Sequence, residues 1–250
     1  MISTTLRLAI LLSTAAFIQA FTPASLIETG LAQTAPAKPV LKGFPFTNES
    51  LAYTVNWPSG LTLGETHISA TTDSAGWRFE LALDAGIPGF AVKDRYYSTT
   101  SLDLCSESFS KDSVHGSRRN TEKVTIDKAT SMAIRTPSTG PGESKAMVPD
   151  CVRDALTFLY YARRELGQGR VPAPQEIIFG AIYNGMFEYT GAETIKVGNK
   201  PTVTDKVVCH IKGPASDIQF DVYFDRDPAR TPVSIRVPFP LGKFSLELVR

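Results

Sequence analysis

The chain has 250 residues, of which 42% are hydrophobic and 20% are charged, with 26 Lys and Arg against 25 Asp and Glu. This composition excludes a disordered or collagen-like chain. The near-neutral charge gives no electrostatic reason to bind nucleic acid or an anionic membrane surface. The longest basic clusters are the pairs Arg118-Arg119 and Arg163-Arg164, which we interpret as solvated surface charges because they form no basic stripe.

Residues 1–32 are typical of a secretory signal peptide. Arg7 precedes a run of about 14 mostly apolar residues, shorter than the ~20 that a transmembrane helix needs. The alternative interpretation is a short buried helix or a membrane anchor. Small residues permit cleavage after Ala20 or, preferably, after Ala32, which leaves a polar tail over residues 33–43. No cysteine follows the apolar run, so we expect no lipoprotein anchor, a periplasmic or secreted location, and no transmembrane segment in the mature chain.

Residues 44–250 show apolar residues alternating with polar ones in repeated runs. Period two places successive side chains on opposite faces of a strand, so each run predicts a half-buried strand. Turn-forming residues separate the runs, as at residues 58–60, 73–76, 198–199 and 213–214. Roughly ten or eleven runs indicate an antiparallel meander within a single β-rich domain. The alternating positions that we single out are Leu51, Tyr53, Val55 and Trp57; Trp77, Phe79, Leu81 and Leu83; Ile218, Phe220, Val222 and Phe224; Val233, Ile235 and Val237; and Phe244, Leu246 and Leu248.

Residues 150–166 break this pattern and predict a helix. Asp150 is placed to cap the first turn, Asp154 lies near the positive end of the helix dipole, and Gly167 and Gly169 provide the stop. An amphipathic helix must bury its apolar stripe, and the concave face of a curled sheet can cover it. The predicted fold is therefore mainly β with one central α-helix, in which a curled, open, barrel-like antiparallel meander packs around the helix. The apolar stripe consists of Val152, Ala155, Leu156, Leu159, Ala162 and Leu166.

The chain contains three cysteines, Cys105, Cys151 and Cys209. In an oxidising compartment an odd number predicts one disulfide and one leftover thiol. Cys105 and Cys151 flank a polar, turn-rich region, whereas Cys209 lies in a strand-like run, so we predict a Cys105–Cys151 disulfide and a buried free Cys209. The alternative is three buried, unpaired cysteines.

The sequence shows no recognisable catalytic, metal-binding or cofactor-binding motif. His67, His115 and His210 each stand alone, without the spacing that presents two metal ligands together. No nucleophile elbow and no phosphate-binding loop occurs. Asp225 and Asp227 are interpreted as shaping a polar turn, with Arg230 pairing nearby. We therefore expect no enzyme activity, no cofactor and no metal.

Aromatic residues make up 10% of the chain and include the doublets Tyr96-Tyr97 and Tyr160-Tyr161. Tyr160 and Tyr161 point in different directions on the predicted helix, so at least one should reach the interior of the sheet or the rim of a cavity. Core packing is the plainer explanation. With Trp57, they are the candidate lining of a ligand cleft.

Several segments together resemble the bacterial "domain of unknown function 3108" family. The first two, residues 49–57 and 63–65, resemble its opening strands, and residues 154–163 resemble its central helix. Residues 225–233 and 242–244 resemble its closing strands. The likeness spans about residues 44–250 of this chain.

One departure is Asn48, where the family usually has glycine, which affects the expected geometry of the first turn. The resemblance implies an exported envelope protein and carries over no catalytic residue. The expected fold also looks like that of periplasmic lipoprotein carriers, which hold acyl chains between sheet and helix.

Three hypotheses for the function follow. The first is a binding or carrier module for a lipophilic or envelope-derived ligand, held in an apolar cleft between sheet and helix. The second is a structural protein that docks on another envelope protein, which predicts a filled core and a large exposed apolar patch. The third is a hydrolase whose site is assembled from distant residues, which requires a histidine to meet another histidine or a carboxylate in a cleft.

Overall fold

The computed structural model describes residues 48–137, 142–214, 216–239 and 242–250. All of them belong to one compact unit, residues 41–250. The predicted signal peptide and polar tail, residues 1–43, lie outside the described residues and stay predictions, as does the position of the domain boundary. Within the described residues, no helix is both long and apolar enough to cross a membrane.

The described residues form fifteen strands and one α-helix. The elements are β1 (Glu49–Asn56), β2 (Thr62–Thr72), β3 (Trp77–Ile87), β4 (Phe90–Thr100), β5 (Ser106–His115), β6 (Arg118–Asp127), β7 (Met132–Pro137), β8 (Ser144–Met147), β9 (Arg153–Asp154), α1 (Ala155–Gly167), β10 (Gln175–Phe179), β11 (Ala181–Val197), β12 (Lys200–Lys212), β13 (Asp217–Asp225), β14 (Pro232–Phe239) and β15 (Gly242–Leu248).

The strands form a single sheet built from two meanders. Its order is β8-β7-β6-β5-β4-β3-β2-β1-β15-β14-β13-β12-β11-β10-β9. Strands β1 and β15 pair antiparallel and join the two meanders along a seam. The predicted antiparallel pattern is therefore correct for every neighbouring pair except β9 and β10, which are parallel. The two edges, β8 and β9, do not pair within the described residues, so the sheet is large, curled and open.

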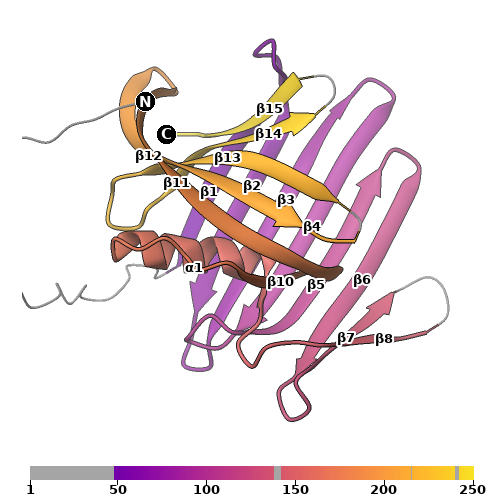
Figure 1. The fold of residues 1–250 in the computed structure, drawn as a ribbon. Coiled ribbons are helices and arrows are strands. Elements are labelled where there is room, and N and C mark those ends of the chain that lie inside the picture. Colours follow the sequence, from indigo (N-terminus) through magenta and orange to yellow (C-terminus); the bar gives the residue numbers. More distant parts are fainter. Residues whose placement is uncertain (1–47, 138–141, 215, 240–241) are drawn as a thin grey trace, which may run out of the picture. The chain divides into compact units, whose positions relative to one another are not determined.

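The two meanders overlie each other, with α1 against both. Figure 1 shows β11–β13 crossing over β2–β5. One hydrophobic cluster joins Leu156 of α1 to Phe79 in the first meander, and a second joins Phe158 of α1 to Phe187 in the other. Burying both sides of a helix against sheet removes its apolar surface from water, which is the main favourable contribution to folding.

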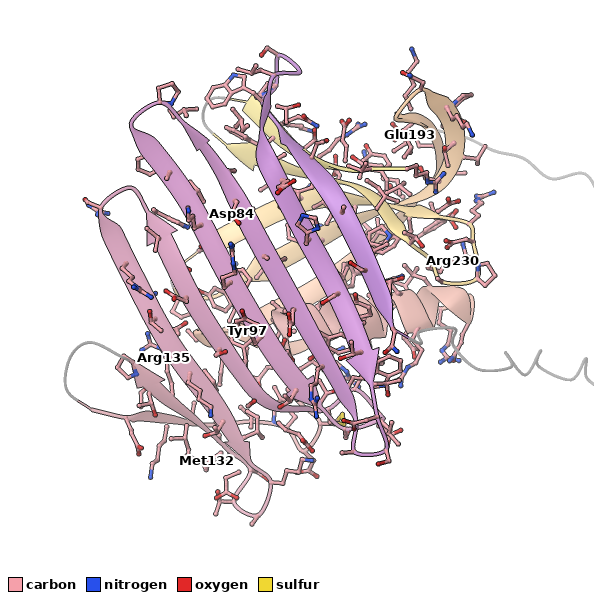
Figure 2. All side chains as sticks on the ribbon, turned by 180° about the vertical axis from the view of Figure 1, so that it is seen from behind. Asp84, Tyr97, Met132, Arg135, Glu193 and Arg230 are labelled. Atoms are coloured by element: carbon pink, nitrogen blue, oxygen red, sulfur yellow. A yellow bond between two sulfur atoms is a disulfide. The ribbon has the colours of Figure 1, made fainter. Side chains whose placement is uncertain are left out.

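The outward-facing positions of the first meander are mostly polar. Figure 2 looks onto this outer face, where Asp84 of β3 and Tyr97 of β4 are labelled, and Tyr97 is 47% exposed. Their chain neighbours Leu83 and Tyr96 point the other way, because successive side chains of a strand alternate between faces. The predicted alternation is thus confirmed in β3 and β4, and the predicted turns at residues 58–60, 73–76, 198–199 and 213–214 separate the observed strands.

The sequence prediction undercounted the strands. The region between Cys105 and Cys151, interpreted as polar and turn-rich, contains the four strands β5–β8. Strand β5 carries Lys111, Ser113 and His115 on the same face, so its two faces are both largely polar and the alternation is weak there. Period-two patterning identifies a strand only when one of its faces is apolar.

The helix begins at Ala155, later than the predicted start at residue 150. Its N-cap is Asp154 and not Asp150, because the Asp154 side chain accepts hydrogen bonds from two N–H groups of the first turn. The preceding residues are held elsewhere, since Arg153–Asp154 forms β9 beside β10. The predicted end is correct: the C-cap is Gln168, and Gly169 follows with a positive φ of 72°.

Candidate functional site

An apolar cavity lies between the two meanders, beside the helix. Its volume is about 390 Å³, within the few hundred Å³ typical of small-molecule sites. No charged residue contributes to its described lining, and Ser216, Tyr96 and Tyr183 supply the hydroxyl groups. The lining residues are Ile68, Leu81, Tyr96, Ala155, Leu156, Phe158, Leu159, Ile177, Phe179, Tyr183, Phe187, Cys209, Ile211, Ser216, Ile218, Phe220, Val222, Ile235 and Leu246.

Strand register explains why these residues share one surface. Ile68, Leu81 and Tyr96 are direct cross-strand partners on β2, β3 and β4. In the second meander, Cys209 faces Phe220, and Ile211 faces Ile218. Side chains directly opposite each other on adjacent strands lie on the same face of a sheet. The apolar half of the alternating sequence pattern therefore becomes a continuous cavity wall.

Buried hydroxyl groups fix the N-terminal end of α1. The Asp154 carboxylate accepts hydrogen bonds from Ser98 Oγ at 2.5 Å, Ser106 Oγ at 2.6 Å and Thr157 Oγ1 at 2.7 Å. Its other oxygen accepts the N–H groups of Leu156 at 3.0 Å and Thr157 at 3.1 Å. Five donors offset the cost of burying this carboxylate, which is 0% exposed. The cap thereby attaches the helix to β4 and β5.

A buried ion pair fixes the other end of the helix. Arg163, interpreted from the sequence as a solvated surface charge, is instead 0% exposed. Its guanidinium donates to both carboxylate oxygens of Glu49, at 2.6 and 2.8 Å. Arg163 Nε also donates to the backbone carbonyls of Ala229 and Arg230, at 3.1 and 3.2 Å. Arg163 can be buried because carboxylate and carbonyl oxygens accept hydrogen bonds from its guanidinium group.

Tyr160 joins this ion pair to the aromatic core. Its hydroxyl donates to Glu49 Oε1 at 3.2 Å, and its ring stacks on Phe79 with centroids 4.1 Å apart. Burial raises the pKa of the Tyr160 hydroxyl above its ordinary value. Tyr160 is therefore a neutral donor and a packing residue.

The disulfide lies close to the N-terminal end of the helix. Cys105 and Cys151 form it, as predicted, with 4.7 Å between their Cα atoms. It connects the start of β5 to the segment before β9. Cys209 is a buried free cysteine, also as predicted. Burial raises the pKa of the Cys209 thiol to about 12, so this thiol stays protonated and unreactive near neutral pH.

The three residues proposed to line a cleft do not line the apolar cavity. Trp57 lies just after β1, packed edge-on against Phe244 with ring centroids 4.7 Å apart. Tyr160 is enclosed in the core, as described above. Tyr161 is partly buried, and the guanidinium carbon of Arg153 lies 3.6 Å from the centroid of the Tyr161 ring. Trp57 instead lines a separate groove with Asn56, Pro58 and Lys243, so the expectation that these aromatic residues line a ligand cleft stays a prediction.

The three histidines lie on different strands and remain separate. His67 on β2 lies 3.8 Å from Glu65, and His210 on β12 lies 3.6 Å from Glu188. His115, at the end of β5, forms a 2.9 Å hydrogen bond to Asp94 Oδ1. No group of three or more His, Cys, Asp or Glu that could hold a metal occurs in the described part of the chain.

An open groove adjoins the His115–Asp94 pair. The groove has a volume of about 1010 Å³ and is lined by Gly89, Phe90, Lys111, Ser113, His115, Gly116, Ser117, Arg118, Arg119 and Asn120. It is polar and basic, whereas the cavity is apolar. The sequence does not predict either set of lining residues as a site, although it places Leu81, Ile218, Phe220 and Ile235 on the apolar faces of their strands.

The predicted polar turn between β13 and β14 is present. Asp227 accepts hydrogen bonds from the N–H and the Oγ1 of Thr231, at 2.9 and 2.6 Å. The guanidinium of Arg230 donates to Asp205 of β12 at 2.7 Å, and not to the side chain of either aspartate of the turn. Figure 2 shows Arg230 beside the helix, where its carbonyl accepts from Arg163.

An open, curled β-sheet that encloses one helix and an apolar cavity defines the structural class of this protein. Residues 52–249 match the family described as "Protein of unknown function (DUF3108)", and the chain belongs to this family. No curated protein matches it. The fold is similar to the crystal structure of a beta-barrel-like protein of domain of unknown function DUF1849 from Brucella abortus, with a TM-score of 0.59. The two share 8% sequence identity over 82% of this chain and 96% of the other, so this likeness shows the fold alone.

The segments that carry the family resemblance meet at the buried ion pair. Glu49 comes from the first segment, Arg163 from the helix, and the carbonyls of residues 229 and 230 from the closing segment. Asn48, the departure noted in the sequence, has a positive φ of 48°. Asparagine is one of the few residues other than glycine that adopts this left-handed conformation readily. The backbone of the turn before Glu49 can therefore have the same conformation with asparagine as with glycine.

Proposed function

We propose that this protein is an exported, non-enzymatic binding or carrier module for a ligand with a long apolar part. The observation that carries the proposal is the cavity of about 390 Å³, whose described lining holds no charged residue. Side chains that line it, including Leu81, Ile218 and Phe220, remain half-buried although they face the interior of the sheet. Covering them with a ligand would remove this apolar surface from water.

The attachment of α1 at both ends supports a persistent cavity. The buried cap at Asp154 and the ion pair at Arg163 hold the helix against different strands. The helix therefore forms a fixed wall, and a pre-formed site avoids the ordering cost that a flexible one incurs on binding. Export to an oxidising compartment is supported by the Cys105–Cys151 disulfide.

The other two hypotheses have weaker support. A docking protein was expected to have a filled core, and the cavity argues against it. For a hydrolase, His115 does meet the carboxylate of Asp94 beside a groove. In the described residues, however, no serine, threonine or cysteine forms a hydrogen bond with the His115 imidazole, so the pairing of nucleophile and base that covalent hydrolysis uses has no support at this site.

The first experiment tests for a bound ligand. The full-length chain is expressed with its leader, purified from the envelope fraction without reductant, and measured by native mass spectrometry before and after organic extraction. We expect an additional, lipid-sized mass that extraction removes. A bare polypeptide that also fails to bind the neutral fluorescent probe N-phenyl-1-naphthylamine would refute the carrier proposal.

A pair of variants localises the binding. Ile218→Trp places a large ring in the cavity, whereas Gln219→Trp adds the same ring to the exposed face of the same strand. We expect the affinity for N-phenyl-1-naphthylamine to fall at least tenfold in the first variant and to stay unchanged in the second. Equal affinities in both variants would place the binding outside the cavity.

A further inference from the structure

Lys111 lies at the border between the apolar cavity and the polar groove. Its Nζ is 4.6 Å from the ring centroid of Phe179 and 5.9 Å from that of Tyr96. Both of these rings line the cavity. Lys111 itself lines the groove. One ammonium group thus touches the wall of the apolar site and faces the polar one.

The neighbouring carboxylates make their ion pairs with other cations. Glu122, the direct cross-strand partner of Lys111, accepts from Arg135 Nε at 2.8 Å. Asp94 is bonded to His115, as described above. No carboxylate of the described residues lies within ion-pair distance of Lys111, and its ammonium group lies over the two rings.

The groove beyond Lys111 is also basic. Arg118 and Arg119 line it, together with His115, and no acidic residue does within the described chain. Arg119 is neutralised by Asp112, at 2.7 Å. Arg118 is exposed and has no carboxylate partner among the described residues. Lys111 and Arg118, which both line the groove, therefore lack an ion-pair partner among the described residues.

We infer that the ligand is an amphiphile with a single long alkyl chain and an anionic head, the chain lying in the cavity and the head on Lys111. This inference rests on the proposed carrier function and specifies the chemical class of its ligand. A cation over aromatic rings is favourable by itself, and an anion placed next to it gains a charge-assisted hydrogen bond in a partly desolvated position. Carboxylate and phosphate heads share this chemistry.

The test compares twelve-carbon ligands that differ only in the head group. Dodecanoate, dodecyl phosphate, dodecanol and dodecyltrimethylammonium are titrated, below their micelle concentrations, against the full-length chain loaded with N-phenyl-1-naphthylamine. We expect the two anions to displace the probe at concentrations at least tenfold lower than dodecanol, and the cation to be the weakest. The relative affinities of dodecanoate and dodecyl phosphate then distinguish a fatty-acid head from a phosphate head.

Matched variants assign the effect to Lys111. Lys111→Met should weaken the binding of both anions at least tenfold and leave dodecanol unchanged, and Lys111→Arg should retain most of the preference. Lys123→Met is the control, because Lys123 is an exposed lysine on the opposite face of the adjacent strand, and it should change nothing. Circular dichroism verifies that each variant is folded.

The outcomes separate this inference from the proposal on which it rests. If no twelve-carbon ligand displaces the probe, the cavity does not hold an alkyl chain and the carrier proposal fails. If dodecanol binds as tightly as the anions, or Lys111→Met leaves the preference intact, the carrier proposal stands and the assignment of an anionic head is wrong.

Discussion

The inner face of the sheet is filled at one end and hollow beside it. At the filled end, Phe79 is stacked under Tyr160 and the exposure of both is 0%. At the hollow end, Ile218 and Phe220 face the cavity and remain half-buried. The same alternation produces both regions, because Phe79, Ile218 and Phe220 all lie on the inner faces of their strands. The difference is what lies opposite: a helix side chain fills the first, and no described side chain fills the second.

Stability and binding are therefore supported by different residues of one surface. Close packing stabilises a protein because each buried group gains dispersion contacts on all sides. A residue that borders a cavity lacks some of those contacts, and its substitution should affect the ligand more than the fold. The predictions below test this separation, beginning with the largest expected change in the free energy of unfolding.

Arg163→Met should cause the largest loss at the filled end. It leaves the Glu49 carboxylate, which accepts both guanidinium donors, without its partner, a change that typically costs about 3–5 kcal/mol. Urea denaturation monitored by circular dichroism measures the loss. The double variant Glu49→Gln/Arg163→Met should recover part of it, because no charge is then left buried. A single variant as stable as the parent would show that the pair contributes little.

Phe79→Ala and Phe220→Ala compare the two regions directly. Phe79 is fully buried, so Phe79→Ala should lower the free energy of unfolding by about 3–5 kcal/mol. Phe220 is half-buried, so Phe220→Ala should lower it by roughly 1–2 kcal/mol, because the removed atoms are less completely enclosed. The same urea titrations give both values. The affinity for N-phenyl-1-naphthylamine should change in the opposite order: Phe220→Ala should weaken it more than Phe79→Ala does. Equal losses of stability would mean that the cavity wall is packed as tightly as the core.

Replacing Cys105 and Cys151 together by Ala should destabilise the protein by roughly 2–4 kcal/mol, the usual range for a disulfide. The bond closes a loop with a sequence separation of 46, and its loss gives the unfolded chain more freedom. Comparing the denaturation midpoints of the double variant and of the parent with and without reductant gives the effect. If reduction alone left the midpoint unchanged, the bond would have no stabilising role.

The buried thiol of Cys209 predicts a pH dependence of stability above pH 9, and this residue lines the hollow region. Burial raises the pKa of its thiol to about 12 from an ordinary value of 9.0, so the folded state holds this proton more tightly than the unfolded state does. The contribution is fully present below pH 9 and decreases as the pH rises toward 12. Cys209→Ala should therefore make the stability less sensitive to pH between 9 and 11. Identical pH profiles for the parent and the variant would contradict the assignment.

Much of the fold could be predicted from sequence, and the reasons are local. Strands such as β3 and β13 alternate clearly, so Phe79, Leu81 and Phe220 were placed on apolar faces before their partners were known. The disulfide followed from the compartment and from the position of Cys209 within a strand. The family resemblance was carried by short segments whose order along the chain is fixed.

The site could not be predicted to the same degree because it depends on contacts between distant strands. Phe179 and Lys111 are in contact although β10 and β5 are far apart in the sequence. The periodicity of hydrophobic residues along a strand gives no information about such a contact. Strand β5 is largely polar on both faces, so the sequence pattern does not identify it as a strand. Asp150 and Asp154 both suit an N-cap, and what decides between them is the pairing of β9 with β10, which is also non-local.

The seam between β1 and β15 has a consequence for how the protein folds. The hydrogen bond from Thr54 Oγ1 to the carbonyl of Glu247 joins residues 193 positions apart. Strand β1 cannot acquire its second neighbour until β15 has been synthesised and brought back to it, and pairing over such a separation is slow. Until then both meanders present an unpaired edge, the kind of edge that recruits strands from other chains. We therefore expect the unfinished protein to depend on holding chaperones more than its moderate size alone would require.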